Sequence, residues 1–359
     1  MARKTNNKIL HKAKESKSDE FYTQYCDIER ELIHYSSQFK GKTVYCNCDD
    51  PAKSNFIKYF VDNFHILGLK KLITTCYAKR DNSIFDGHRV PVGYMFVYNG
   101  EEIKCLNELP SIVPLQGDGD FRSEECKHLL AECDIVVTNP PFSLFREFIS
   151  QIMRYEKKFL VIGNINAITY KEIFELIQNN KVWLGHNLGR GISGFIVPEH
   201  YELYGTEARI DENGQRIVSS NNCLWLTNLE SSLRNEFIPL SKKFKGNESS
   251  YPVFDNFEAI NVNKTLDIPA DFAGAMGVPI TFLHKYNPNQ FQIIRFRKGY
   301  DEKDLSINGK CPYFRILIRN LDFTMDEYER ISGSLKRNCA KAPAKPDNAN
   351  PMAIQLSLF

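Results

Sequence analysis

Extended apolar runs and helical patterns alternate through the first half of this chain, and this alternation constrains the fold most. Runs typical of strands lie at 42–48, 70–77, 134–138 and 159–163. Segments with apolar residues at helical spacing lie at 27–39, 54–64, 124–131 and 143–155. Alternating β and α units predict an α/β domain with a mostly parallel sheet and right-handed crossovers.

The carboxyl ends of the predicted strands form the expected ligand site. Parallel sheets bind small molecules beyond those ends, near a switch in strand order. The segments that follow Cys48, Tyr77, Leu115 and Thr138 should therefore line one rim and meet around a single small molecule.

The remaining segments are mostly extended. A hairpin-like stretch at 94–105 turns at Asn99-Gly100. Three further pieces are predicted to close the same domain, at 182–184, 192–197 and 223–228. Beyond about residue 230, turn residues and strands at 290–296 and 314–318 predict a separate, irregular lobe. The tail from 338 to 353 is rich in Lys, Pro, Ala and Asn and should be a flexible linker.

Composition places the chain among folded proteins of the cytoplasm. Its 359 residues allow two cores, and 42% hydrophobic with 25% charged residues is average for globular proteins. No apolar run approaches the length of a membrane-spanning helix. The ten cysteines form no C-x-x-C pair and suit reduced thiols. Cys46, Cys48 and His65 are the one zinc candidate, but alternation along a strand explains that spacing, so no metal is expected.

Cations gather at the N-terminus, although the net charge is only +2. Within residues 1–17, six Lys and Arg residues stand against Glu15 alone. Such an arm suits contacts with phosphates, and a solubilising terminus is the alternative interpretation.

The buried run 134–138 leads directly into Asn139-Pro140-Pro141-Phe142, the strongest chemical signal in the chain. Proline fixes φ and has no N–H, so this loop is stiff. The Asn139 Oδ1 atom and the Pro140 carbonyl can accept the two hydrogens of an exocyclic aromatic amine, and Phe142 can stack on its ring. Acceptors of this kind strengthen as positive charge develops on the nitrogen. The loop therefore indicates transfer to a planar amine, with a simple stiff turn as the alternative.

The chain resembles the EcoRI-type adenine-specific DNA methyltransferases from its start to about residue 320. The resemblance rests on the catalytic loop and on residues 17–24 (KSDEFYTQ), 44–51 (VYCNCDDP), 117–121 (GDGDF) and 277–283 (GVPITFL). It implies a Rossmann-like sheet, S-adenosylmethionine as methyl donor, and N6 of a flipped-out adenine in double-stranded DNA as acceptor. Together with the charge and composition of the segments, it predicts a basic arm at 1–17, a catalytic domain at 18–230, a smaller, irregular α+β target-recognition lobe at 231–335 and a flexible tail at 336–359.

The resemblance further implies which residues hold the cofactor: Phe21, Tyr22, Thr23, Asp49, Asp50, Asp118, Asp120 and Phe121. Asp49 and Asp50 could instead cap the helix near Ser54, and Phe121 could be simple core. The chain lacks the glycine-rich turn that many methyltransferases have after the first strand, and no acid follows the second strand at Cys76-Tyr77.

Two further groups of residues are candidates for macromolecular contacts. Five basic residues in Gly-, Asn- and Tyr-rich segments suit DNA, with an ordinary solvated face as the alternative: Arg190, Lys285, Arg295, Arg297 and Lys298. The final pentapeptide resembles the motif that docks bacterial replication proteins on the sliding clamp, through Gln355, Leu356, Leu358 and Phe359. An apolar tail that folds back is the alternative there.

Several alternatives for the activity stay open. Cytosine-N4 and RNA amino-methyltransferases share the amide-proline chemistry, and a non-catalytic DNA-binding protein could share the scaffold. Cytosine-C5 transfer is disfavoured because it needs a thiolate, usually after proline, and no Pro-Cys occurs. The resemblance makes GAATTC-like sites the first to test, and a monomer is expected.

Overall fold

A computed structural model describes residues 21–78, 92–101, 112–187, 191–199, 208–212, 214–219 and 222–339. These residues fall into two compact units. The larger unit comprises Phe21–Ile238 and Thr281–Asn289, and the smaller comprises Pro239–Ile280 and the described residues from Gln290 onward.

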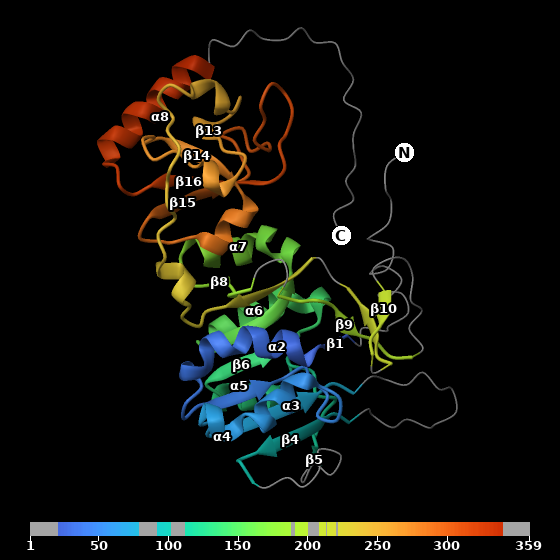
Figure 1. The fold of residues 1–359 in the computed structure, drawn as a ribbon. Helices are drawn as coiled ribbons and strands as arrows, with labels where there is room; N and C mark the ends of the chain where they lie inside the picture. Colours follow the sequence, from blue (N-terminus) through green and yellow to red (C-terminus); the bar gives the residue numbers. More distant parts are fainter. Residues whose placement is uncertain are drawn as a thin grey trace. The chain divides into compact units, whose positions relative to one another are not determined.

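An eight-stranded sheet in the order β5-β4-β3-β2-β6-β7-β12-β8 forms the centre of the larger unit (Figure 1). Its strands are β2 (Thr43–Cys46), β3 (Lys71–Cys76), β4 (Tyr94–Tyr98), β5 (Ile112–Pro114), β6 (Ile135–Thr138), β7 (Lys158–Asn164), β8 (Trp183–Leu184) and β12 (Cys223–Thr227). The helices of this unit are α2 (Tyr25–Leu32), α3 (Asn55–Asp62), α4 (Phe64–Leu67), α5 (Glu124–Glu132), α6 (Phe145–Arg154) and α7 (Lys171–Gln178). Short 3-10 turns are η1 (Ile33–Gln38), η3 (Phe142–Leu144), η4 (Ile165–Thr169), η5 (Ser232–Asn235) and η8 (Ile280–Lys285).

The sheet is mixed, which corrects the prediction of a mostly parallel one. Among the described strands, β3, β2, β6 and β7 pair in parallel, whereas β4, β5, β12 and β8 join by antiparallel pairings. Helical crossovers connect the central strands. Strand β12 pairs antiparallel with β7, and β8 follows helix α7 and pairs antiparallel with β12.

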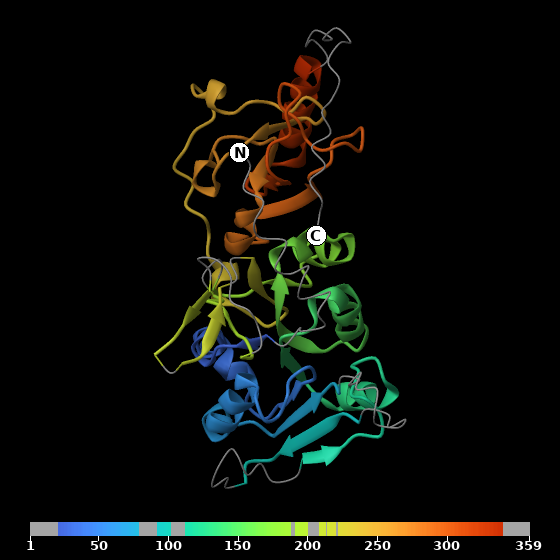
Figure 2. The same cartoon turned by 90° about the vertical axis from the view of Figure 1, so that its right-hand side faces the viewer.

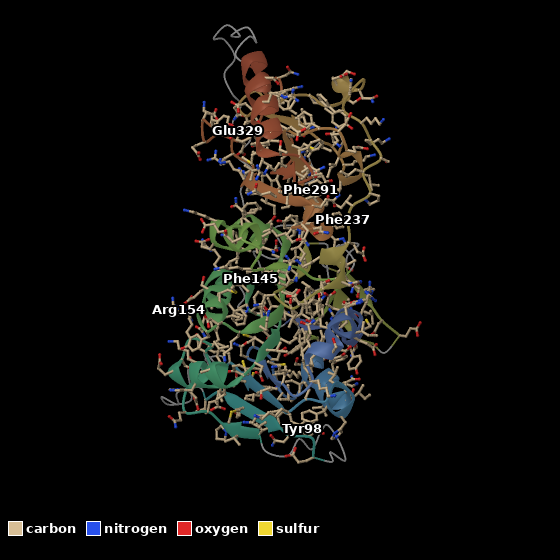
Figure 3. The ribbon with its side chains drawn as sticks, turned by 90° about the vertical axis from the view of Figure 1, so that its left-hand side faces the viewer. Tyr98, Phe145, Arg154, Phe237, Phe291 and Glu329 are labelled. Carbon is tan, nitrogen blue, oxygen red and sulfur yellow. The ribbon has the colours of Figure 1, made fainter. Side chains whose placement is uncertain are left out.

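Helices cover both faces of the sheet (Figure 2), with α2, α3 and α4 on one side and α5, α6 and α7 on the other. All residues of β2 and β6 are buried, as expected for strands covered on both faces. On the first face, Val44 and Val137 pack with Phe56 and Phe60 of α3. On the second, Phe145 of α6, labelled in Figure 3, packs so closely over Gly163 that a Cβ there would lie 2.7 Å from its ring.

A second, four-stranded sheet in the order β1-β9-β11-β10 belongs to the same unit. Its strands are β1 (Tyr22–Thr23), β9 (Phe195–Ile196), β10 (Ala208–Ile210) and β11 (Arg216–Val218). The segment 192–197, predicted to close the same domain, lies in the larger unit, where β9 pairs with β1 of this second sheet. The two other closing segments are confirmed as β8 and β12 of the main sheet.

The smaller unit has its own sheet in the order β13-β14-β16-β15. Its strands are β13 (Ala259–Asn261), β14 (Ala275–Pro279), β15 (Phe291–Phe296) and β16 (Arg315–Asn320), with turns η6 (Glu248–Ser250) and η7 (Thr265–Asp267). Phe254, Ala275 and Leu317 form part of its core.

A helix in this unit, α8 (Met325–Cys339), was not predicted. The Thr324 hydroxyl accepts from the Glu327 N–H, and the Glu327 carboxylate accepts from the Thr324 N–H, so a capping box starts the helix. The helix also occupies the first residues of the predicted 336–359 tail. No described helix is long and apolar enough to cross a membrane.

Candidate active site

Asn139 lies directly beyond the carboxyl end of β6, between two strands that run parallel to it. Its Nδ2 donates to the Phe21 carbonyl at 3.1 Å. Its Oδ1 is buried and accepts no hydrogen bond from any described residue. A buried acceptor left unpaired costs about 1–3 kcal/mol. An amide held by its nitrogen, with its oxygen free, is the arrangement needed to receive an incoming N–H donor.

The segment Phe21-Tyr22-Thr23 lies beside this loop, as the hydrogen bond from Asn139 to Phe21 requires. Asn55, at the start of α3, donates from Nδ2 to the Thr23 carbonyl at 2.8 Å. The Thr23 side chain is 3% exposed, and its Oγ1 has no partner among the described residues. Two unpaired buried polar atoms, Thr23 Oγ1 and Asn139 Oδ1, therefore lie on adjoining segments.

One aromatic ring of the second sheet, that of Phe195, supports the loop. Phe195 of β9 meets Phe142 edge-on at a centroid distance of 6.5 Å and Phe21 at 5.9 Å. Phe195 is 3% exposed, whereas Phe142 is only partly buried. Phe195 thus fixes the ring of Phe142 while leaving part of it accessible. No sequence motif marks Phe195, because it reaches the loop from a different sheet.

Asp49 follows β2, and both of its carboxylate oxygens are used within the protein. The Ser54 hydroxyl donates to Oδ1 at 2.7 Å and the Thr138 hydroxyl donates to Oδ2 at 2.6 Å. Burial raises the pKa of Asp49 to about 6, against the opposing effect of the two hydroxyl donors. Ser54 in turn caps α3 by accepting from the Phe56 N–H. Asp50 lies at the surface of the same turn, where it accepts from Ala52 N and pairs with Lys53 at 3.9 Å.

The segment 117–121 reaches the same rim from β5. Asp118 accepts from the Ala78 N–H through its carbonyl, just beyond the end of β3. Gly119 has φ +79°, and a Cβ there would lie 2.4 Å from the Cys76 carbonyl, so only glycine fits. The Arg122 guanidinium forms two hydrogen bonds with Asp120 and holds the pKa of that carboxyl below its usual range.

Phe121 is 4% exposed and packs edge-on against Phe148 of α6. The predicted rim is thus assembled from the ends of β2, β3, β5 and β6. Within this rim, the Asp49 carboxylate accepts a hydrogen bond from Thr138 of β6, whereas the Asp120 carboxylate forms an ion pair with Arg122.

The predicted DNA-contacting residues come from both units of the chain. Arg295 lies within β15 of the smaller unit, and Arg297 and Lys298 follow that strand. Each is in an ion pair: Arg297 and Lys298 with Asp304, and Arg295 with Glu302. Arg297 also stacks over Phe314 at 4.3 Å. Lys285 is exposed in the larger unit, and Arg190 lies outside the described residues, as do residues 1–17 and the C-terminal pentapeptide.

Two buried carboxylates on α2 hold the segment that leads to Phe195. Glu31 accepts from the His186 N–H at 2.6 Å, from the Asn187 N–H at 2.9 Å and from the Tyr35 hydroxyl at 3.0 Å. One turn earlier, Asp27 accepts from the backbone N–H of Ser193 at 2.7 Å. Both carboxylates are 0% exposed. No motif marked this pair in the sequence.

The zinc candidate of the sequence includes Cys46 and Cys48. Cys46 and Cys48 are free, and burial raises the pKa of both well above the usual value. Strand β2 ends at Cys46, so alternation along a strand does not explain their spacing. Within the described ranges, no group of three or more His, Cys, Asp or Glu side chains is arranged to hold a metal ion.

A mixed α/β sheet with a proline-stiffened amide loop at the end of a central strand defines the class of the protein as a methyltransferase. Comparison with known proteins specifies it further. Residues 9–321 match the family described as adenine-specific methyltransferase EcoRI, and the chain belongs to that family. This membership confirms the prediction of an adenine-specific DNA methyltransferase.

Curated relatives match over nearly their whole length. The chain is 64% identical over 322 residues to the type II methyltransferase M.EcoRI of Escherichia coli, covering 89% of this chain and 98% of that protein. It is 39% identical over 328 residues to the type II methyltransferase M.MpnI of Mycoplasma pneumoniae, covering 86% and 97%. It is 37% identical to M.MgeORF184P of Mycoplasma genitalium over 331 residues, covering 86% and 98%. No solved structure matches the chain significantly.

Proposed function

We propose that this enzyme transfers a methyl group from S-adenosylmethionine to N6 of an adenine flipped out of double-stranded DNA. Asn139 Oδ1 carries the proposal, because it is a buried acceptor with no described partner beyond a central strand. It would accept one N–H of the adenine amine and the Pro140 carbonyl the other, which directs the nitrogen lone pair away from both. Pro141 stiffens the turn, and Phe142 would stack on the base and offset part of the unstacking cost of about a few kcal/mol.

The cofactor would bind at one rim of a Rossmann-like sheet, at the ends of β2, β3, β5 and β6. When bound, S-adenosylmethionine supplies an electrophilic methyl group on sulfur. The unpaired Thr23 hydroxyl supports a polar ligand beside Asn139. Around it, Phe21, Tyr22, Asp50 and Asp118 would contact the cofactor, and Asp120 would accept from its adenine amine beside Phe121. Asp49 belongs to the same rim, with both oxygens already engaged.

A target-recognition lobe at 231–335 would make most of the sequence-specific DNA contacts. The catalytic domain would comprise residues 18–230. The arm at 1–17, Arg190 and Lys285 would contact phosphates. Arg295, Arg297 and Lys298 would reach DNA only as part of their ion-paired cluster, since Asp304 and Glu302 already neutralise them. A monomer suffices for this arrangement.

Incubation of the protein with labelled S-adenosylmethionine and plasmid DNA tests the proposed reaction. We expect label in DNA as N6-methyladenine, and mapping of the modified positions will give the target sequence, with GAATTC-like sites tested first. Label as N4-methylcytosine or in RNA would favour the related amino-methyltransferases. Absence of label at any sequence would favour a non-catalytic DNA-binding protein.

We also propose that the last five residues dock on the bacterial sliding clamp. Leu358 and Phe359 would fill an apolar pocket, with Leu356 beside them, while Gln355 would fix the orientation by hydrogen bonds. The segment between α8 and this pentapeptide would act as a linker and raise the effective concentration of the enzyme near replicating DNA. Deletion of residues 355–359 should remove clamp pull-down and leave methylation of short duplexes unchanged. Equal pull-down by the truncated and full-length chains would refute the docking.

A further inference from the structure

A buried carboxylate joins two segments of the active site that are far apart in sequence. Asp49 lies after β2, Ser54 begins the cap of α3, and Thr138 is the last residue of β6. The two hydroxyls donate to different oxygens of Asp49, at 2.7 and 2.6 Å. Thr138 immediately precedes Asn139, so a shift of Thr138 moves the catalytic amide.

The environment of Asp49 differs from that of a residue awaiting a charged ligand. Its side chain is 7% exposed, Ser54 is 5% exposed and Thr138 is fully buried. The groups that face it are the Cys46 and Cys48 thiols and the Asp50 carboxylate, and no described cation compensates its charge. Burial therefore raises the pKa of Asp49 to about 6. Burial makes the ionised Asp49 carboxylate costly, and both of its oxygens already accept hydrogen bonds from hydroxyls. This arrangement indicates that Asp49 holds other residues of the protein in place.

We propose that Asp49 is a positioning residue for catalysis: through Thr138 it fixes the start of the Asn139 loop relative to the cofactor turn and the capped end of α3. The inference rests on the proposed role of Asn139. It assigns Asp49 a function different from direct cofactor contact, which the resemblance to the family implied. The bond to Thr138 holds the acceptor where the amine arrives, and small displacements of reacting groups cost large factors in rate.

The central variant is Thr138→Val, which removes the hydroxyl and preserves the shape of the side chain. We expect kcat for methylation of a cognate duplex to fall by about 10- to 100-fold. The dissociation constant for S-adenosylmethionine should change little, because no cofactor contact changes. The melting temperature should fall, because the buried Asp49 carboxylate loses one of its two donors. Thr138→Ser retains the hydroxyl and should restore most of kcat.

A matched control exists on the neighbouring strand. Thr74 of β3 is also fully buried, and its hydroxyl has no described partner. Thr74→Val makes the same chemical change without breaking a bond to Asp49, and it should keep the wild-type kcat. If Thr74→Val loses as much activity as Thr138→Val, a general effect of the sheet is responsible and the inference fails.

Asp49→Asn separates positioning from charge. Its amide can accept from one hydroxyl and donate to the other, so we expect much of kcat to survive. If Asp49 instead bound the cofactor through its charge, Asp49→Asn would weaken S-adenosylmethionine binding with kcat unchanged, and that result would overturn the proposal. This variant also tests the proposal if Thr138→Val does not fold.

Failure of this inference is distinguishable from failure of the proposed function. Wild-type kcat in Thr138→Val together with an inactive Asn139→Ala would refute only the role of Asp49. An active Asn139→Ala would refute the proposed function itself, whatever the Thr138 variants do.

Discussion

Replacement of Asn139 by Ala is expected to lower kcat for DNA methylation by about 10²- to 10³-fold, the usual cost of losing one preorganised transition-state contact. The removed Oδ1 is the buried acceptor that no described residue uses. Ala also loses the hydrogen bond from Nδ2 to Phe21, which fixes β1 beside the loop. The loss should appear in kcat more than in the dissociation constant for S-adenosylmethionine, because the acceptor acts on the amine as charge develops.

Asn139→Asp provides the matched comparison. A carboxylate keeps the acceptor oxygen but cannot donate to the Phe21 carbonyl, so its second oxygen faces another oxygen. We therefore expect activity between that of the wild type and Asn139→Ala. Single-turnover rates with a hemimethylated duplex, alongside equilibrium binding of the cofactor, measure both effects. Full activity in Asn139→Ala would remove the basis for the proposed mechanism.

The catalytic strand and loop could be predicted from sequence because their signals are local. The four buried residues of β6 end where two prolines follow, and neighbouring periodicities place this strand among β/α units. The family resemblance then supplied the acceptor and the enzyme class, which one tetrapeptide could not. The residues around Asn139 were harder to predict. Phe195 and Ser54 reach the site only through strand pairing and a helix cap, and neither stands in a motif.

The errors in the fold have a related cause. Periodicity reports that a segment is extended but not which strand it pairs with, so the pairing of β9 with β1 in a second sheet could not be predicted. Helix α8 begins with a capping box at Thr324 and Glu327, but in the sequence this signal stands among turn residues. The basic residues near β15 illustrate a third limit. Arg297 looked free for DNA in the sequence, yet Asp304, seven positions later, folds back to pair with it.

The largest effect on stability is expected at Glu31, which the sequence presents as an ordinary helical acid. In the structure it is 0% exposed and accepts from Tyr35, His186 and Asn187. Glu31→Ala leaves these donors without their acceptor. Each donor left without an acceptor costs about 1–3 kcal/mol, and three donors lose theirs. We therefore expect the free energy of unfolding to fall by about 3–5 kcal/mol.

Urea unfolding followed by tryptophan fluorescence measures this change, since Trp225 lies in the same core. Glu31→Gln keeps one acceptor oxygen but turns an N–H toward the remaining donors, so it should fall between the wild type and Glu31→Ala. Glu29 is exposed on the same helix, and Glu29→Ala should change the free energy of unfolding by no more than about 0.5 kcal/mol. If Glu31→Ala is as stable as Glu29→Ala, the buried carboxylate does not hold the segment at His186, and another contact must fix the path of the chain toward Phe195.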